Sequence, residues 1–144
     1  MRKIDLIVIH CSATDYDGQS AEWIRKDHMK PKCDGGRGFS DIGYHFFINQ
    51  SGLIEPGRSM AIPGAHAYPK NANSLGLCLA GKKTFHKVQF KSLRLLLGLL
   101  RSHEWIKNAK VVAHNKINTG KTCPNFDVSE FATFWDSGDW LSSR

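Results

Sequence analysis

An almost unbroken apolar segment from Lys3 to Cys11, rich in Ile, Val and Leu, restricts the fold of this chain more than any other feature. Continuous hydrophobicity of this kind is typical of a strand that is buried on both faces, since a half-exposed strand alternates apolar and polar residues. The polar run from Ser12 to Ser20 ends the segment. We therefore expect a buried strand with His10 at its carboxyl end.

Strand and helix patterns interleave along the rest of the chain. Ser20 is a suitable cap for a helix that ends near Pro31, and Gly52 supplies the turn of a short hairpin. The segment from Arg58 to Asn73 has little periodicity and is expected to be a long loop lining one face of the molecule. The other predicted elements are the hairpin strands Tyr44 to Asn49 and Leu53 to Glu55, a strand from Ser74 to Ala80, a helix from Phe90 to Trp105, a strand from Lys110 to Ala113 and a helix from Val128 to Trp135.

The order of these elements predicts an α/β fold, with a mixed central sheet flanked by about three helices. A length of 144 residues suits one domain, so we expect residues 1–144 to form a single domain. Any active site must then be assembled from segments that are distant in the sequence.

The formal net charge of +7 favours a polyanionic partner, such as nucleic acid, an anionic membrane or the bacterial wall. The basic residues are scattered, and no RNA-binding aromatic signature or recognition-helix pattern is visible, so we expect no nucleic-acid partner. The apolar stretch near the amino terminus is too short and too interrupted for a signal peptide or a membrane span. We therefore expect synthesis in the cytoplasm and no insertion into a membrane.

Three residues form a candidate metal site: His10, His114 at the end of a predicted strand, and Cys123 in a loop. A catalytic zinc ion takes three protein ligands of this kind and keeps one position for water. Taken singly, each residue has a simpler interpretation as a boundary histidine or an unremarkable thiol. Among the other cysteines, Cys11 and Cys78 are expected to be core thiols, and Cys33 has no assigned role. His45 should lie on the opposite face of its strand from Tyr44. A surface position is expected for His28, His86 and His103.

Three blocks in this order resemble the zinc-dependent N-acetylmuramoyl-L-alanine amidases: Val8 to Thr14, Gly43 to Ile48, and Ala113 to Pro124. The resemblance is strongest to the phage-lysozyme-like branch of the type 2 amidase family, which is related to the peptidoglycan recognition proteins. Further agreement at Gly64 to Ala67 and at Asn73 to Leu79 extends it over most of the chain.

The resemblance implies that His10, His114 and Cys123 bind Zn²⁺, that Tyr44 and Lys121 assist the reaction, and that His66 contacts substrate. The implied reaction is hydrolysis, by zinc-activated water, of the amide bond between N-acetylmuramic acid and L-alanine in peptidoglycan. Eight residues separate His114 from Cys123, one more than we expect in close relatives, so Lys121 could be displaced. The cysteine ligand argues against the cytosolic wall-recycling branch, which uses aspartate.

Two other functions stay open. Peptidoglycan-recognition modules share this fold and can lack the metal, although all three ligand types and both assisting residues are present here. A relative in the phage branch also regulates a polymerase, but that role would depend on surface residues and an amino-terminal extension. Because no secretion signal is expected, the resemblance implies a monomeric phage or prophage lysis protein that acts on the wall after the membrane has been opened.

Overall fold

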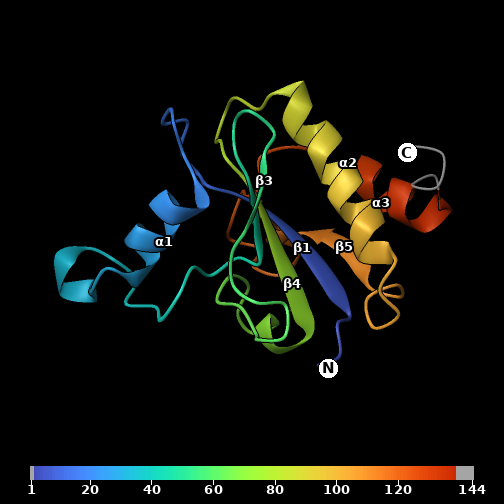
Figure 1. Cartoon of the computed structure of the whole chain (residues 1–144), viewed down its shortest axis with the longest axis horizontal. Coiled ribbons are helices and arrows are strands. Elements are labelled where there is room, and N and C mark those ends of the chain that lie inside the picture. Colours follow the sequence, from blue (N-terminus) through green and yellow to red (C-terminus); the bar gives the residue numbers. More distant parts are fainter. Residues whose placement is uncertain (1, 139–144) are drawn as a thin grey trace.

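The computed structural model describes residues 2–138 and contains the mixed sheet that the sequence predicts (Figure 1). Five strands lie in the order β3-β2-β4-β1-β5; β2 and β3 are antiparallel, and the other neighbours are parallel. The strands are β1 (Leu6–Cys11), β2 (Phe46–Ile48), β3 (Ile54–Pro56), β4 (Ser74–Leu79) and β5 (Lys110–Ala113). Both central strands, β1 and β4, are almost wholly buried, as continuous hydrophobicity requires.

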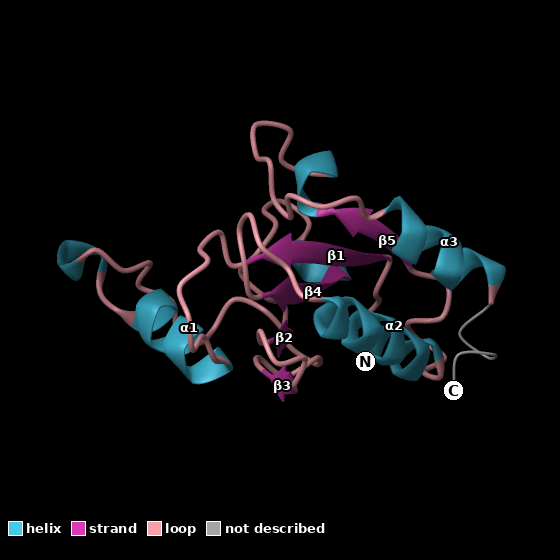
Figure 2. Cartoon of the chain, turned by 90° about the horizontal axis from the view of Figure 1, so that it is seen from above, coloured by secondary structure: helices cyan, strands magenta, loops and turns pink. Residues whose placement is uncertain are grey.

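Helices cover both faces of this sheet (Figures 1 and 2). The helices α2 (Lys87–Arg101) and α3 (Ser129–Ser137) pack on one face, where the larger apolar core also holds alternate residues of β1, β4 and β5. Helix α1 (Ala21–Met29) lies on the other side and closes a smaller core around Phe47 and Cys78. Because side chains alternate along a strand, Ile9 faces α2 and α3 while His10 faces away from them.

Local signals explain where most elements begin and end. The Ser20 side chain caps α1 by accepting a hydrogen bond from the Trp23 amide, and Gly52 turns the hairpin with a φ of 85°. The predicted helix from Phe90 to Trp105 is shifted along the sequence. It begins at Lys87, because His86 and Gln89 form a reciprocal capping box, and it ends at Arg101.

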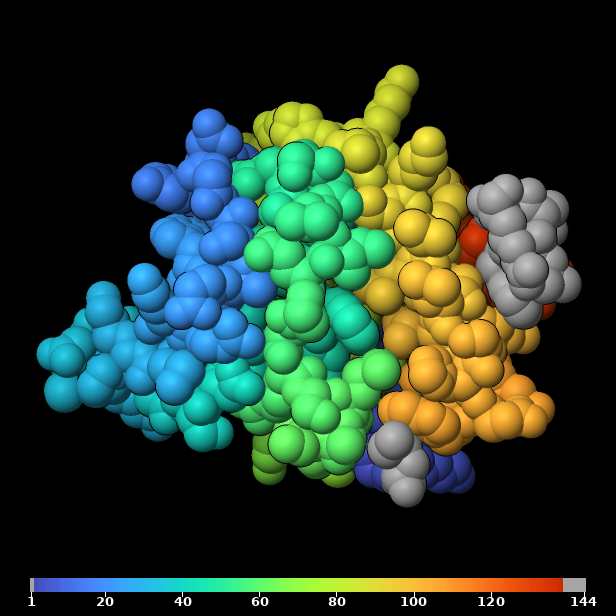
Figure 3. All heavy atoms as spheres, in the orientation of Figure 1, coloured from blue at the N-terminus to red at the C-terminus, as the bar shows by residue number. Residues whose placement is uncertain are grey.

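The segment that joins β2 to β4, including β3, fills the middle of the molecule between α1 and α2 in the view of Figure 3. Its long loop contributes Ala65, His66 and Tyr68 to a cleft at the carboxyl ends of β1 and β5. Within residues 2–138, no helix combines the length and apolar character needed to cross a membrane.

Candidate metal centre

The three candidate ligands converge at the carboxyl ends of two neighbouring parallel strands. One ligand atom from each of His10, His114 and Cys123 lies within 4.8 Å of the others. Strand register explains the histidine pair, because Ile9 on β1 pairs with Ala113 on β5, and the next residue of each chain segment is a histidine. The two imidazole centroids are 4.3 Å apart. Cys123 reaches the same point from the loop before α3.

In both histidines, Nε2 makes a hydrogen bond to another side chain of the protein. His10 Nε2 lies 2.8 Å from His66 Nδ1, and His114 Nε2 lies 2.7 Å from Asn118 Oδ1. The amide oxygen of Asn118 can only accept, so His114 must carry its proton on Nε2. A partner of this kind sets the tautomer of a metal-binding histidine and leaves the other nitrogen free.

The two Nδ1 atoms indicate a site for a metal ion. His114 Nδ1 is buried and, among the residues that the structure describes, has no hydrogen-bond partner. His10 Nδ1 lies 4.0 Å from Cys123 Sγ, too far for a strong hydrogen bond but suitable for two ligands of one ion. Buried polar atoms normally find partners, so the orphaned nitrogen supports a cation at this point. Two imidazoles and one thiolate suit zinc and leave a fourth position open.

Electrostatics favours neutral imidazoles in this cluster. Burial, followed by the influence of His66 and His114, lowers the pKa of His10 well below its usual value, and burial also lowers the pKa of His114. Neutral rings keep the lone pairs that a metal requires. The adjacent Cys11 thiol and burial raise the pKa of Cys123, whereas a 3.1 Å hydrogen bond from the Cys11 amide favours its thiolate. A bound cation would overcome the first two effects.

A cleft of about 510 Å³ opens above these three residues, and the other predicted site residues line it. The half-buried Tyr44 ring lies 5.1 Å from the His10 ring, and burial raises the pKa of its hydroxyl well above the usual value. Lys121 is exposed and lowers the pKa of His114 through its positive charge. Although the loop has one more residue than expected, Lys121 still faces the cleft.

His66 contacts one of the candidate ligands. Although it lines the cleft, it is only partly exposed; Nδ1 faces His10, and Nε2 lies 3.2 Å from Ser74 Oγ. Gly76 on β4 makes room for the ring, because a Cβ there would lie 2.7 Å from His66 Cγ. His66 thus connects the His10 imidazole to the central strand β4.

Sequence reasoning missed two residues of the cleft. Asn118 lies in the loop with the additional residue, where it accepts from His114 and donates to the Tyr68 carbonyl oxygen over 2.8 Å. Arg37 is exposed in the loop after α1, and its charge lowers the pKa of His114. The longer loop was a visible signal for Asn118. No spacing pattern marked Arg37.

The surface position predicted for His28 is wrong. It is 5% exposed, and its Nδ1 accepts a hydrogen bond from the Gly43 amide over 2.9 Å. Burial lowers its pKa to about 4. Its place on the inner side of α1 allows it to hold the segment that leads into Tyr44.

The remaining histidine and cysteine predictions have mixed outcomes. His45 lies outside the ligand cluster and is buried between the Ile62 carbonyl and the Gly76 amide. Cys78 and Cys11 are buried as predicted, but Cys11 also contacts Cys123 through its amide. Cys33 is exposed.

Comparison with known proteins identifies a matching family, sequence relatives and solved structures of the same fold. The N-acetylmuramoyl-L-alanine amidase family profile matches residues 1–126. The endolysin of Escherichia phage T7 is 34% identical, over 96% of this chain and 90% of its own length. Among solved structures, the endolysin amidase LysCS from Clostridium intestinale has a TM-score of 0.74 and 28% identity, covering 90% of this chain and 81% of its own. Drosophila PGRP-LB has a TM-score of 0.72 and 26% identity, covering 86% and 76%.

Proposed function

Because this chain belongs to the N-acetylmuramoyl-L-alanine amidase family, we propose that it is a zinc-dependent hydrolase that cleaves the amide bond between N-acetylmuramic acid and L-alanine. The observation that carries the zinc requirement is the orphaned His114 Nδ1, which lies with His10 and Cys123 in one group of ligand atoms. Agreement with phage endolysins over nearly the whole chain supports peptidoglycan as the substrate.

In this proposal, His10 Nδ1, His114 Nδ1 and Cys123 Sγ would hold the ion. When bound, zinc supplies Lewis acidity and lowers the pKa of a coordinated water towards ~7. Lys121 places its ammonium beside the cleft, where it stabilises negative charge that develops on the amide oxygen. Tyr44 stays protonated because its pKa is raised, so its hydroxyl can donate a hydrogen bond that orients substrate or water.

His66 and Asn118 act on the ligands. His66 orients His10, and Asn118 keeps the proton of His114 on Nε2, so that both Nδ1 atoms would be free to hold the ion. His66 also lines the cleft, and a contact with glycan or peptide there belongs to the proposal.

The biological setting of the proposal is lysis of a bacterium by a phage or prophage. The chain would act as a monomer and as one catalytic domain over residues 1–144, of which residue 1 and residues 139–144 lie outside the described part. It would reach the wall after the membrane has been opened, and its positive charge would favour association with the polyanionic wall.

The principal alternative is a peptidoglycan-binding module without catalysis, since Drosophila recognition proteins share this fold. The ligand cluster, with Tyr44 and Lys121 in the same cleft, favours catalysis. A polymerase-regulating role has no specific observation in its favour.

Mass analysis of digested peptidoglycan tests the proposal. We expect purified protein to carry about one zinc per chain and to release stem peptides with free L-alanine amino termini, while the glycan strands stay uncut. Cys123→Ser and His114→Ala should each lose most zinc and all activity, because two ligands hold the ion poorly. Zinc-loaded protein that binds the wall but releases no stem peptide would be a binding module, and wild-type activity in either variant would exclude this metal site.

A further inference from the structure

A second hollow of about 430 Å³ lies along α1 and continues the metal cleft. The two share Ser12, His28, Arg37 and Tyr44, so they form one groove with two arms. One arm extends from the metal centre towards Tyr68 and the long loop. The other, here called the α1 arm, is lined in addition by Thr14, Trp23, Ile24, Lys26, Asp27 and Lys30.

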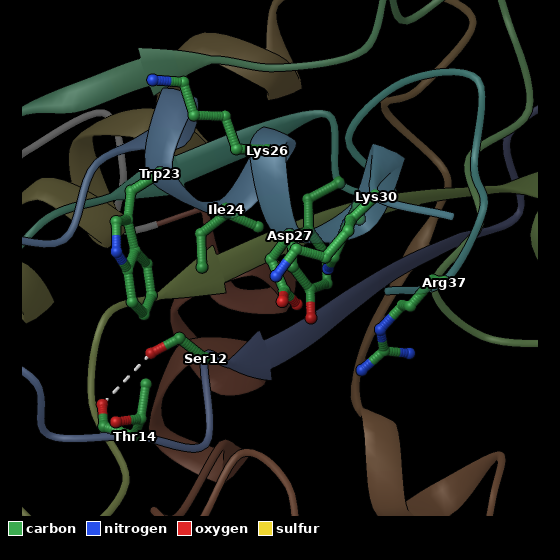
Figure 4. A pocket seen from close by; sticks show the side chains of 10 residues that line it. Ser12, Thr14, Trp23, Ile24, Lys26, Asp27, Lys30 and Arg37 are labelled. Atoms are coloured by element: carbon green, nitrogen blue, oxygen red, sulfur yellow. Dashed lines mark hydrogen bonds between the residues drawn. The ribbon is translucent and has the colours of Figure 1, made fainter. Parts of the chain in front are cut away.

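Helix α1 forms one wall of this arm. Trp23 and Asp27 lie one turn apart on α1 and share a helical face, Lys30 follows at the end of the helix, and all three line the hollow. Figure 4 shows Trp23 and Arg37 on opposite sides of the hollow, with Ser12 between them. Trp23 lines only the α1 arm, so it lies at the end away from the metal cleft.

An aromatic stack is the distinctive feature of that end. The Trp23 and Tyr16 rings are almost parallel, with an interplanar angle of 3° and centroids 5.3 Å apart. Both side chains remain open to solvent, Tyr16 at 60% and Trp23 at 38% exposure. Tyr and Trp are enriched at binding surfaces, because each combines a large apolar ring with a polar group.

Hydrogen bonds hold the Tyr16 loop in place. The buried Gln19 side chain donates to the carbonyl oxygens of Thr14 and Tyr16 over 2.8 Å and 2.9 Å. Gln50, from the β2–β3 turn, also donates to the Tyr16 carbonyl. The stack is therefore arranged before any ligand arrives, which lowers the entropy cost of binding.

We propose that the α1 arm binds the glycan strand, with a sugar ring beyond the reacting muramic acid packed against Trp23. This inference rests on the proposed function and assigns one part of the substrate to one arm. Pyranose rings have flat faces of C–H groups that pack on indole. Their hydroxyl groups can accept from the Thr14 hydroxyl, whose oxygen is held in place by the Tyr16 amide. With the scissile amide at the junction beside Tyr44, the stem peptide occupies the other arm, towards Tyr68 and Lys121.

Kinetics on two substrates that carry the same stem peptide test this assignment. One is a muramoyl tripeptide with a single sugar, and the other is a peptidoglycan tetrasaccharide. Trp23→Ala should lower kcat/KM on the tetrasaccharide roughly 2- to 10-fold, mainly through KM, and leave the single-sugar substrate unchanged. Zinc content should not change, because Trp23 does not contact the ligands.

Leu99→Ala is the matched control, because Leu99 is an exposed apolar residue (58%) on α2 outside the groove, and it should affect neither substrate. Trp23→Leu keeps apolar bulk without the flat ring and serves if the alanine variant is unstable. An equal effect of Trp23→Ala on both substrates, or no effect on either, would overturn the assignment.

A binding measurement separates this inference from the proposed function. Zinc-loaded protein should bind a glycan strand stripped of its stems in calorimetry, and Trp23→Ala should weaken that binding by a similar factor. If no stem peptide is ever released but the glycan still binds through Trp23, the hydrolase proposal fails and the α1 arm assignment stands. Binding of free stem peptide that depends on Trp23 would place the peptide in this arm instead.

Discussion

Replacing Asn118 by leucine should weaken zinc binding although Asn118 is not a ligand. The amide oxygen accepts the Nε2 proton of His114 over 2.7 Å, which is a short contact for N–H···O. Without it, that N–H loses its partner, and the ring is no longer held in the tautomer whose Nδ1 is free for the ion. Loss of a side chain that hydrogen-bonds to a metal ligand typically lowers metal affinity about 10- to 100-fold, or ~1.4 to 2.7 kcal/mol.

Chelator competition on purified protein measures this effect independently of activity. Asn118→Asp is the informative second variant, because a carboxylate can still accept from His114 but cannot donate to the Tyr68 carbonyl oxygen. It should keep near-normal zinc affinity while KM rises, since the loop that carries Tyr68 is released. The control Thr119→Ala changes an exposed side chain of the same loop. Unaltered zinc affinity in Asn118→Leu would refute the reasoning.

Three further outcomes are expected. Lys121→Ala should keep its zinc but turn over ~10² to 10³ more slowly, and metal analysis showing lost zinc would contradict its assignment to oxyanion stabilisation. Gly76→Ala should displace His66 and weaken chelator-measured zinc affinity, whereas Gly120→Ala, where a Cβ meets nothing within 4 Å, should not. The pKa of His28, about 4 against its usual 6.5, means that the unfolded chain binds the proton first, so stability present above pH 6.5 is lost as the pH falls towards 4. His28→Asn keeps an acceptor for the Gly43 amide, and its chemical denaturation should show a pH dependence smaller by about 2 kcal/mol over that range; an unchanged dependence would show that His28 does not contribute.

The fold was largely predictable because its signals are local. Continuous hydrophobicity identified β1, while Ser20 marked a helix cap and Gly52 marked a turn. The order of the predicted strands and helices indicated a mixed sheet. The boundaries of α2 were less accurate because a capping box of His86 and Gln89 depends on side-chain geometry that periodicity does not report.

The candidate ligands of the site were predictable from the sequence, but the hydrogen bonds that orient them were not. Resemblance selected His10, His114 and Cys123, which the structure brings together. The hydrogen bond from His10 to His66 joins residues 56 positions apart, so no local pattern could predict it. The bond from His114 to Asn118 is local, but it depends on how the loop between them folds. His28 was misplaced for a related reason, since its partner Gly43 is known only from the packing of α1.

The positions of the ligand residues along the chain also affect the local stability of different parts of the fold. His10 belongs to the first strand, and Cys123 lies between the last strand and the last helix. A single ion bonded to both would cross-link residues that are far apart in the sequence and would hold the central sheet to the segment that leads into α3. Chelation should then loosen the carboxyl-terminal third first, making it the earliest part to exchange amide hydrogens and the earliest to be cut by a protease.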